Sequence, residues 1–329
     1  MARVDAVSQA PPDDPRHLAA TLAPVLTDAC EGRLSDITWF RTDWQRGGAA
    51  TGTARYRSPD GRAVEVVVKL PVVQRELMWT QRLQDSNGHG SGDGPVVARL
   101  YASGQTLGGY DLSWLVIERF EHGPLGTHWH DDHVSRIADA AARFYLAASN
   151  WSVDQPARRE PWDDLLKEAH QSLKTNPVPR QQEWRNALKA LRSCLGGIVE
   201  QWEARDTAQW LHGDLHLANA MSRVSMESGP VCLIDLAEVR AGHWVEDAVY
   251  LERQLWSRPQ RLKGHGPVKT IAAARRRRGL PVEEDYPRLA MIRRALLAGT
   301  APRFLRSEGD PRHLDACLDW LVRAVSELK

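Results

Sequence analysis

The sequence predicts an α+β protein with two lobes: a small antiparallel β lobe that carries one helix, and a larger, mainly helical lobe. Two observations favour this class. Short runs of β-forming residues separated by turns occupy residues 37–120, and apolar residues at helical spacing dominate the rest of the chain. We therefore expect an N-terminal lobe over residues 1–119, of which 1–14 should be flexible, and a C-terminal lobe over 120–329.

The composition is that of a globular protein with substantial cores. The 329 residues are 42% hydrophobic and 26% charged, with a formal net charge of +1. This charge gives no general attraction to nucleic acid or membranes, and no stretch approaches the roughly 18 apolar residues of a membrane span. We expect neither partner. Scattered cysteines without a CxxC pair, and an N-terminus without an apolar signal segment, predict reduced thiols and a cytoplasmic location.

In the N-terminal lobe, turn-forming residues separate the predicted strands, and SPDG at 58–61 is a tight turn. Five strands are expected, near residues 37–45, 50–57, 63–70, 96–104 and 110–120. Apolar spacing near 3.6 residues predicts a helix over 15–30 and a second, inserted between strands, over 72–83. The glycine-rich stretch 86–95 is expected to be a flexible loop.

The C-terminal lobe is predicted to be helical, with one short β interruption at 209–236. This interruption contains LHGDLHLANAM at 211–221 and the apolar strand PVCLID at 230–235. The cluster THWHDDH at 127–133 is expected to cap a helix, because its aspartates complement the helix dipole. The arginine run at 275–278 is expected on a solvated helix face, because no aromatic residues alternate with it as nucleic-acid binding would favour.

Two residues of the N-terminal lobe form a possible ion pair. Lys69 ends the valine-rich stretch EVVVKLP, and Glu76 follows seven residues later on the predicted helix. Taken singly, Lys69 is typical of a lysine that reaches solvent from a strand end, and Glu76 is typical of a helix surface. Their significance depends on what lies further along the chain.

The opening of the β interruption has the spacing H-x-D-x-x-x-x-N, formed by His212, Asp214 and Asn219. Asp235 follows an entirely apolar strand sixteen residues after Asn219. Asn219 and Asp235 offer the hard oxygen ligands that Mg²⁺ prefers, with room for water and phosphate oxygens. Asp214 would then be free to orient the proton of an attacking hydroxyl. A strand lysine, a helix glutamate, a base and two metal ligands in this order are the components of phosphoryl transfer.

With these residues the sequence resembles the aminoglycoside phosphotransferase and choline kinase-like family, small-molecule kinases with a two-lobed protein-kinase-like fold. The HGDxxxxN loop of the family appears as HGDLHLAN at 212–219, and its metal-binding strand as LID at 233–235. A later element that ends in aspartate appears as GHWVED at 242–247. The resemblance spans about residues 35–255, and the loop and the LID strand are its specific part.

The resemblance implies a role for each polar residue of the C-terminal lobe. Asp214 would be the catalytic base, Asn219 and Asp235 the Mg²⁺ ligands, and Asp247 a buried aspartate that braces the loop. Gly213 occupies the position of the protein-kinase HRD arginine, so control by activation-loop phosphorylation is not implied.

For the N-terminal lobe, the resemblance implies that ATP binds there with Mg²⁺. Lys69 and Glu76 match the ion pair that holds the phosphates, and Gly48 lies in a loosely glycine-rich turn expected to cover them. Glu118 and Phe120, within VIERFEHG, match the hinge that borders the adenine. The expected function is transfer of the γ-phosphate of ATP to a hydroxyl of a small molecule.

Several alternatives remain. His212 and His216 suggest a zinc site. Three observations disfavour it: HExxH is absent, no cysteine lies near, and Gly213 breaks a helix. We therefore expect the histidines to support the loop. A kinase-fold nucleotidyltransferase and a regulatory pseudokinase are the other candidates. The arginines of 261–294 make the helical lobe slightly basic, which argues mildly against a polycationic aminoglycoside and leaves sugars, amino alcohols and other antibiotics open.

Overall fold

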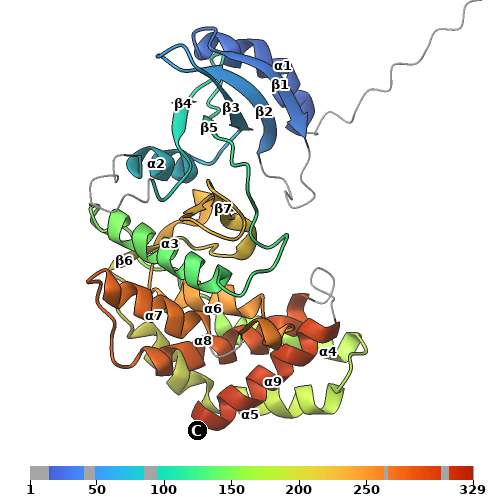
Figure 1. Ribbon diagram of the computed structural model, residues 1–329. Coiled ribbons are helices and arrows are strands. Elements are labelled where there is room, and N and C mark those ends of the chain that lie inside the picture. The colour runs from blue at the N-terminus through green and yellow to red at the C-terminus, as the bar shows by residue number, and fades with distance from the viewer. Residues whose placement is uncertain (1–14, 41–48, 85–94, 263–265, 305–310, 329) are drawn as a thin grey trace, which may run out of the picture. The chain divides into compact units, whose positions relative to one another are not determined.

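The computed structural model describes residues 15–40, 49–84, 95–262, 266–304 and 311–328. The chain divides into two compact units (Figure 1). The first contains Met1–Glu121 and Ile234–Glu238, and the second contains His122–Leu233 and Val239–Lys329. The division falls two residues after the expected lobe boundary, and the segment that carries Asp235 groups with the first unit.

The first unit is built on a five-stranded antiparallel sheet in the order β1-β2-β3-β5-β4. The strands are β1 (Leu34–Phe40), β2 (Ala50–Arg57), β3 (Ala63–Leu70), β4 (Leu100–Gly104) and β5 (Trp114–Glu118). In β3, Val66, Val68 and Leu70 alternate into a core on one face, because successive side chains of a strand point to opposite faces. Lys69 therefore lies on the other face, in register with Thr51 of β2.

A helix lies against each face of this sheet. Helix α1 (Pro15–Ala29) contacts β1 and β2 and contributes Leu22 and Leu26 to the larger core (Figure 1). Helix α2 (Gln74–Arg82) contributes Leu77 to a smaller cluster with Leu115 on the other face. Both helices were predicted, and α2 places Glu76 on the same face of the sheet as Lys69.

Three strands differ from their predicted bounds. β1 begins at Leu34, before residue 37, and its expected residues 41–45 lie outside the described part of the chain. β4 begins at Leu100, after the buried apolar residues 96–98. β5 begins at Trp114, because Leu107 and Tyr110 exchange two main-chain hydrogen bonds in a tight turn that ends before the strand.

The second unit is mainly helical, as predicted. Its helices are α3 (His133–Ala148), α4 (Trp162–Thr175), α5 (Gln181–Glu203), α6 (Val245–Arg253), α7 (Pro267–Arg277), α8 (Tyr286–Thr300) and α9 (Pro311–Leu328). Apolar spacing explains them: in α9, Leu314, Leu318, Leu321 and Val325 share one buried stripe. No helix in the described ranges has the length and apolarity needed to cross a membrane.

Two small strand pairs interrupt the helices. β6 (Gln209–Leu211) pairs with β9 (Arg240–Gly242), and β7 (Ala220–Ser222) pairs with β8 (Val231–Leu233). The expected interruption at 209–236 was therefore too short, since β9 lies beyond it. The segment between β6 and β7 holds the HGDLHLAN motif and a short 3-10 helix, η2 (Leu217–Asn219).

One arginine of α3 holds the β7–β8 hairpin in place. Arg136 donates to the main-chain oxygens of Met226, Ser228 and Gly229 at 2.6, 2.8 and 3.1 Å. His133, one turn earlier in α3, also contacts the Met226 oxygen, at 3.0 Å. Because this hairpin joins the motif to the LID strand, its shape determines the path of the chain from Asn219 toward Asp235.

The arginine run at 275–278 is only partly on the surface. Arg276 and Arg277 are exposed, but Arg275 is 2% exposed and donates two hydrogen bonds to the Pro281 carbonyl oxygen. Its guanidinium lies over the rings of Tyr145 and Trp244, so stacking and hydrogen bonding offset part of the cost of its burial. The expectation of a fully solvated face was wrong for this residue.

Candidate active site

In the first unit, Lys69, Glu76 and Asp235 form a charged cluster. The Lys69 ammonium forms an ion pair with the Glu76 carboxylate, and their side chains are 13% and 7% exposed. The Oδ1 atom of Asp235 lies 3.7 Å from the Lys69 ammonium nitrogen. Residues separated by more than 150 positions therefore meet within this unit, and they include three of the predicted site residues.

Burial and neighbouring charges act against each other on the pKa values of Lys69 and Glu76. Burial acts to lower the pKa of Lys69, but the carboxylates of Glu76 and Asp235 outweigh it and raise that pKa, so the ammonium keeps its charge. Burial also raises the pKa of Glu76, against the opposing effect of Lys69. Lys69 therefore lies between two carboxylates, of which Glu76 is the closer partner.

Asp235 has the exposure and the backbone geometry expected of a functional carboxylate. Its side chain is 46% exposed, and its φ of +64° lies in the left-handed region that a non-glycine residue rarely adopts. Such a conformation costs on the order of 1–3 kcal/mol and is concentrated at functional sites. The strand β8 ends two residues before it and the short helix η3 (Leu236–Glu238) begins directly after it.

The other predicted nucleotide contacts lie at the end of β5. Glu118 is the last residue of that strand, and its carboxylate accepts a 3.1 Å hydrogen bond from the Arg99 main-chain N–H. Phe120, two residues later, is half-buried. Gly48 lies outside the described residues.

In the second unit, Asp247 holds the main chain of the motif. Its carboxylate accepts hydrogen bonds from the N–H groups of His212 and Gly213, both at 2.9 Å. It also accepts from the Tyr145 hydroxyl, at 2.9 Å. Gly213 has a φ of +82°, which glycine adopts without strain. Burial raises the pKa of Asp247, and His212 and Arg240 oppose that rise. This is the buried brace that the resemblance implied.

A buried ionic network supports the same loop from β9. Arg240 donates to the Gly213 carbonyl oxygen at 3.0 Å and to the Glu246 carboxylate at 3.4 Å. Glu246 is 3% exposed and also accepts two hydrogen bonds from Arg205. Sequence reasoning missed Tyr145, Arg205 and Arg240, because none of them lies in a motif and their partners are distant in sequence.

Asp214 is ionised and held by several donors. Its Oδ2 atom accepts from the Asn219 side-chain amide at 2.9 Å and lies 3.3 Å from the Nε2 atom of His216. Burial acts to raise the pKa of Asp214, but hydrogen bonds from His216 and Tyr250 outweigh burial and lower it to about 2. The side chain remains 27% exposed, so a small molecule can reach it.

The side-chain amide of Asn219 binds Asp214 through its nitrogen. Its amide nitrogen donates to the main-chain oxygen of Asp214 at 3.0 Å and to the Asp214 carboxylate at 2.9 Å. The carbonyl oxygen of the same amide is thereby directed away from Asp214. Because Mg²⁺ binds oxygen ligands, this orientation fits a cation. Asn219 and Asp214 thus meet in the second unit, as Lys69, Glu76 and Asp235 do in the first.

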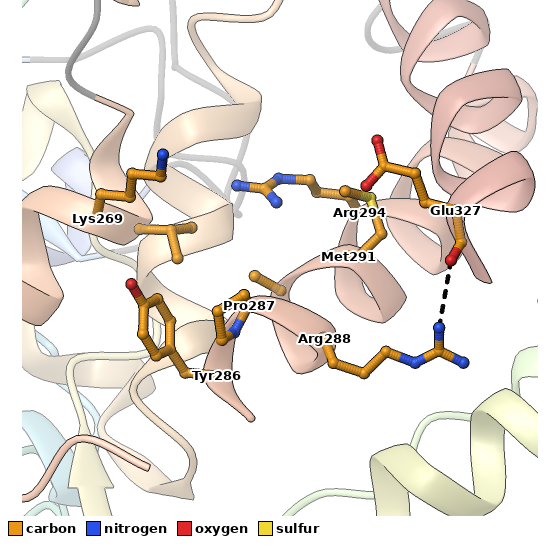
Figure 2. Close-up of a pocket in the computed structure, with 9 residues that line it drawn as sticks. Lys269, Tyr286, Pro287, Arg288, Met291, Arg294 and Glu327 are labelled. Atoms are coloured by element: carbon orange, nitrogen blue, oxygen red, sulfur yellow. Dashed lines mark hydrogen bonds between the residues drawn. The ribbon is translucent and has the colours of Figure 1, made fainter. Parts of the chain in front are cut away.

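A separate pocket of about 440 Å³ lies in the second unit among α7, α8 and α9. Lys269 and Glu327 extend from opposite sides of it (Figure 2). Its arginines have structural partners: Arg294 binds both carboxylate oxygens of Glu252, and Arg288 donates to the Glu327 main-chain oxygen near the end of α9. None of the predicted site residues that the structure describes lines this pocket.

The family model for the phosphotransferase enzyme family (APH) matches residues 38–292, about three quarters of the chain. The chain belongs to this family. The matched segment includes every predicted site residue, and the resemblance to aminoglycoside phosphotransferases is confirmed at the level of the family. A search of curated proteins found no match.

Solved structures of several small-molecule phosphotransferases share the fold of this chain. An aminoglycoside phosphotransferase from Alicyclobacillus acidocaldarius is 16% identical with a TM-score of 0.54, and the match covers 99% of this chain and 97% of that one. A microcompartment-associated aminopropanol kinase is 13% identical with a TM-score of 0.56, over 92% and 95% of the two chains. Aminoglycoside 2'-phosphotransferase-IIIa, in complex with GDP, is 13% identical with a TM-score of 0.51, over 94% and 98%. These matches confirm the predicted fold class.

Proposed function

We propose that this phosphotransferase transfers the γ-phosphate of ATP to a hydroxyl group of a small molecule. The observation that carries the proposal is the environment of Asp214. An ionised carboxylate is fixed on a braced loop and remains 27% exposed, and the side chain that helps to fix it, Asn219, directs an oxygen away from it. A positioned base beside an oxygen ligand for Mg²⁺ is the arrangement that phosphoryl transfer requires.

The charged cluster of the first unit supplies the complementary groups. In the proposal, Lys69 binds the phosphates of ATP and Glu76 keeps the lysine in place. Glu118 and Phe120 would border the adenine. Asn219 and Asp235 would hold Mg²⁺, which would neutralise the charge that develops on the phosphate oxygens.

The pKa of Asp214 decides how it acts. A carboxylate with a pKa of about 2 is a weak base, so its first contribution is to accept a hydrogen bond from the substrate hydroxyl and aim the oxygen at the γ-phosphorus. As the new O–P bond forms and the bond to the leaving ADP oxygen breaks, the hydroxyl proton passes to Asp214 and then to solvent. Catalysis therefore rests mainly on orientation and charge stabilisation.

The acceptor is proposed at the level of a class. Aminoglycosides and aminopropanol appear in the names of the similar structures, and we include sugars, amino alcohols and antibiotics. The mild argument against a polycation rests on the basic residues of 261–294, and three of these arginines are held by acidic partners. Arg278, Arg293 and Arg294 are paired with Asp139, Glu160 and Glu252.

The test follows ADP release with Mg²⁺ and ATP across a panel of sugars, amino alcohols and antibiotics. With an accepted substrate, Asp214→Asn should lower kcat on the order of 10²- to 10⁴-fold, because the neutral amide orients the hydroxyl less well and cannot take up its proton. Calorimetry should show Mg²⁺-ATP binding nearly unchanged. Asp111→Asn, at an exposed aspartate, is the matched control and should retain full activity.

Other outcomes contradict the proposal. Release of pyrophosphate in place of ADP would assign nucleotidyl transfer. Binding of Mg²⁺-ATP without turnover on any acceptor class would assign a pseudokinase. Near-normal turnover of Asp214→Asn would contradict only the role assigned to Asp214, and the proposed reaction would stand.

A further inference from the structure

His216 occupies a position in the motif that the proposed mechanism does not yet use. Both of its ring nitrogens have partners within the motif. The Nδ1 atom accepts a 3.0 Å hydrogen bond from the Ala218 main-chain N–H, and the Nε2 atom lies 3.3 Å from Oδ2 of Asp214. The side chain is 18% exposed and lies beside the ring of Tyr250.

These partners determine which nitrogen carries the proton. Because Nδ1 accepts from an amide N–H, it carries no proton, and in the neutral ring the hydrogen must be on Nε2. The Nε2–H group therefore faces the Asp214 carboxylate at 3.3 Å from Oδ2, and a hydrogen bond from His216 is among the causes that lower the pKa of Asp214. The same oxygen, Oδ2, also accepts from the Asn219 amide, so two donors from different residues converge on one oxygen.

Convergence on one oxygen has a mechanical consequence. Rotation of the Asp214 carboxylate would move Oδ2 away from both donors together, so His216 and Asn219 oppose that rotation, as does the hydrogen bond from Tyr250. His216 also caps η2, the short helix that ends at Asn219, through the bond to Ala218. One imidazole thus connects the proposed base to the helix that carries the proposed metal ligand.

We propose that His216 is a positioning residue that holds Asp214 in its reactive orientation by donating from Nε2–H, and that it does not receive the substrate proton. The proposal rests on the proposed function, since it takes Asp214 as the base. The second part follows from the geometry. To accept a proton at Nε2 the neutral ring would have to carry its hydrogen on Nδ1, which would then face the Ala218 N–H donor.

Two substitutions separate the two bonds of His216. Asparagine places an acceptor near the position of Nδ1 and is a preferred N-cap residue, so His216→Asn keeps the cap on η2 and loses the donor to Asp214. Glutamine reaches as far as Nε2 with an N–H group, so His216→Gln keeps the donor and loses the cap. His128→Asn, at an exposed histidine of the same unit, is the control.

We expect His216→Asn to lower kcat on the order of 10- to 100-fold, because misplaced groups lose orientation, with KM for ATP little changed. His216→Gln should restore most of kcat, and the control should match the wild type. Melting temperatures should show that His216→Asn stays folded. Near-normal kcat in His216→Asn, or equal loss in both His216 variants, would overturn the assignment.

A second readout does not depend on turnover. Two-bond ¹H–¹⁵N spectra of the full chain, assigned by the signals lost in His216→Gln, should show the Nε2–H tautomer. The Nδ1–H tautomer would overturn the proposal even in an active enzyme. If the wild type transfers no phosphate, the proposed function fails, and the tautomer still decides whether His216 is the donor to Asp214.

Discussion

The ion pair of Lys69 and Glu76 shows how one residue acquires a function from its surroundings. A lysine at a strand end normally extends into water, and here it is 13% exposed because the face of β3 that carries it is covered by α2. Burial of a charge is costly unless a partner compensates, and the Glu76 carboxylate is that partner. The lysine is therefore held in one direction, which a phosphate ligand requires.

Glu76→Gln should weaken nucleotide binding and leave the fold intact. The amide cannot neutralise the ammonium, so Lys69 would turn toward Asp235, 3.7 Å away, and away from the phosphates. We expect KM for ATP to rise on the order of tenfold, equivalent to about 1.4 kcal/mol, measured by steady-state kinetics.

Glu65→Gln is the matched control for this variant, because Glu65 belongs to β3, the strand that carries Lys69, and pairs with Arg119 on the surface. Surface pairs contribute only about 0–1 kcal/mol, so this control should bind ATP normally. An unchanged KM in Glu76→Gln would exclude the orienting role.

The sequence predicted these residues because they lie in motifs with fixed spacing. Lys69 and Glu76 pair as expected, and Asp214 and Asn219, predicted from one motif, share a hydrogen bond that the sequence did not predict. Arg240 was not found, since an arginine at a strand end has many uses and only its contact with Gly213 reveals this one.

At the scale of the elements, the connection between α7 and α8 holds the start of α6 in place through hydrogen bonds. The Glu283 carboxylate of this connection accepts hydrogen bonds from His243 at 3.2 Å and from the Trp244 indole at 2.9 Å. These two residues directly precede α6, which carries Asp247. Burial acts to raise the pKa of Glu283, but the two hydrogen bonds outweigh it and lower the pKa from 4.5 to about 2.

This low pKa makes stability depend on pH. Below the unfolded-state pKa of 4.5 the unfolded chain protonates Glu283 while the folded state keeps it ionised, so the stabilisation is complete above that pH and is lost as pH falls toward about 2. The difference in free energy of unfolding between wild type and Glu283→Gln should therefore be largest near neutral pH and shrink in acid. Urea denaturation over this range measures it.

Glu284→Gln, at the exposed neighbouring residue, should show no such pH-dependent difference. A difference for Glu283→Gln that stays constant with pH would mean that the substitution acts through shape and not through charge.

Elements with a clear period were predicted well, and short ones were not. β2 and β3 agree with their predicted bounds because eight residues are enough to show alternation. β6 and β9 have three residues each, too few for a period, and their pairing joins segments about thirty residues apart. The start of β1 is irregular, with a register shift between Ser35 and Thr38, which hides the alternation there.

At the scale of the whole molecule, the proposed ligands of ATP and Mg²⁺ belong to both units, whereas composition alone indicated only a globular protein with substantial cores. Lys69, Glu76 and Asp235 belong to the first unit, and Asp214 and Asn219 belong to the second. A ligand that binds only the folded protein adds its binding free energy to stability. Melting of the full chain therefore reports on the proposed nucleotide site without knowledge of the acceptor.

Mg²⁺-ATP should stabilise the wild type by about 2.7 kcal/mol at a hundredfold excess over Kd. Removal of Mg²⁺ with EDTA should abolish most of this stabilisation. Asp235→Ala lacks one proposed carboxylate ligand, so ATP should stabilise this variant by the same small amount with Mg²⁺ and with EDTA. Differential scanning fluorimetry measures the shift in melting temperature. Asp60→Ala, at an exposed aspartate of the same unit, is the control. Equal Mg²⁺-dependent shifts in Asp235→Ala and the wild type would contradict the metal role.

The hold of Arg136 on the β7–β8 hairpin also bears on how the chain can change in length. Surface hairpins usually accept inserted or deleted residues, because their tips touch only water. Here the oxygens of Met226, Ser228 and Gly229 all bind one guanidinium, so an added residue would shift several of them out of reach together. This hairpin is therefore a poor place for an epitope tag or a fused domain, although its sequence resembles that of an ordinary loop of serine and glycine.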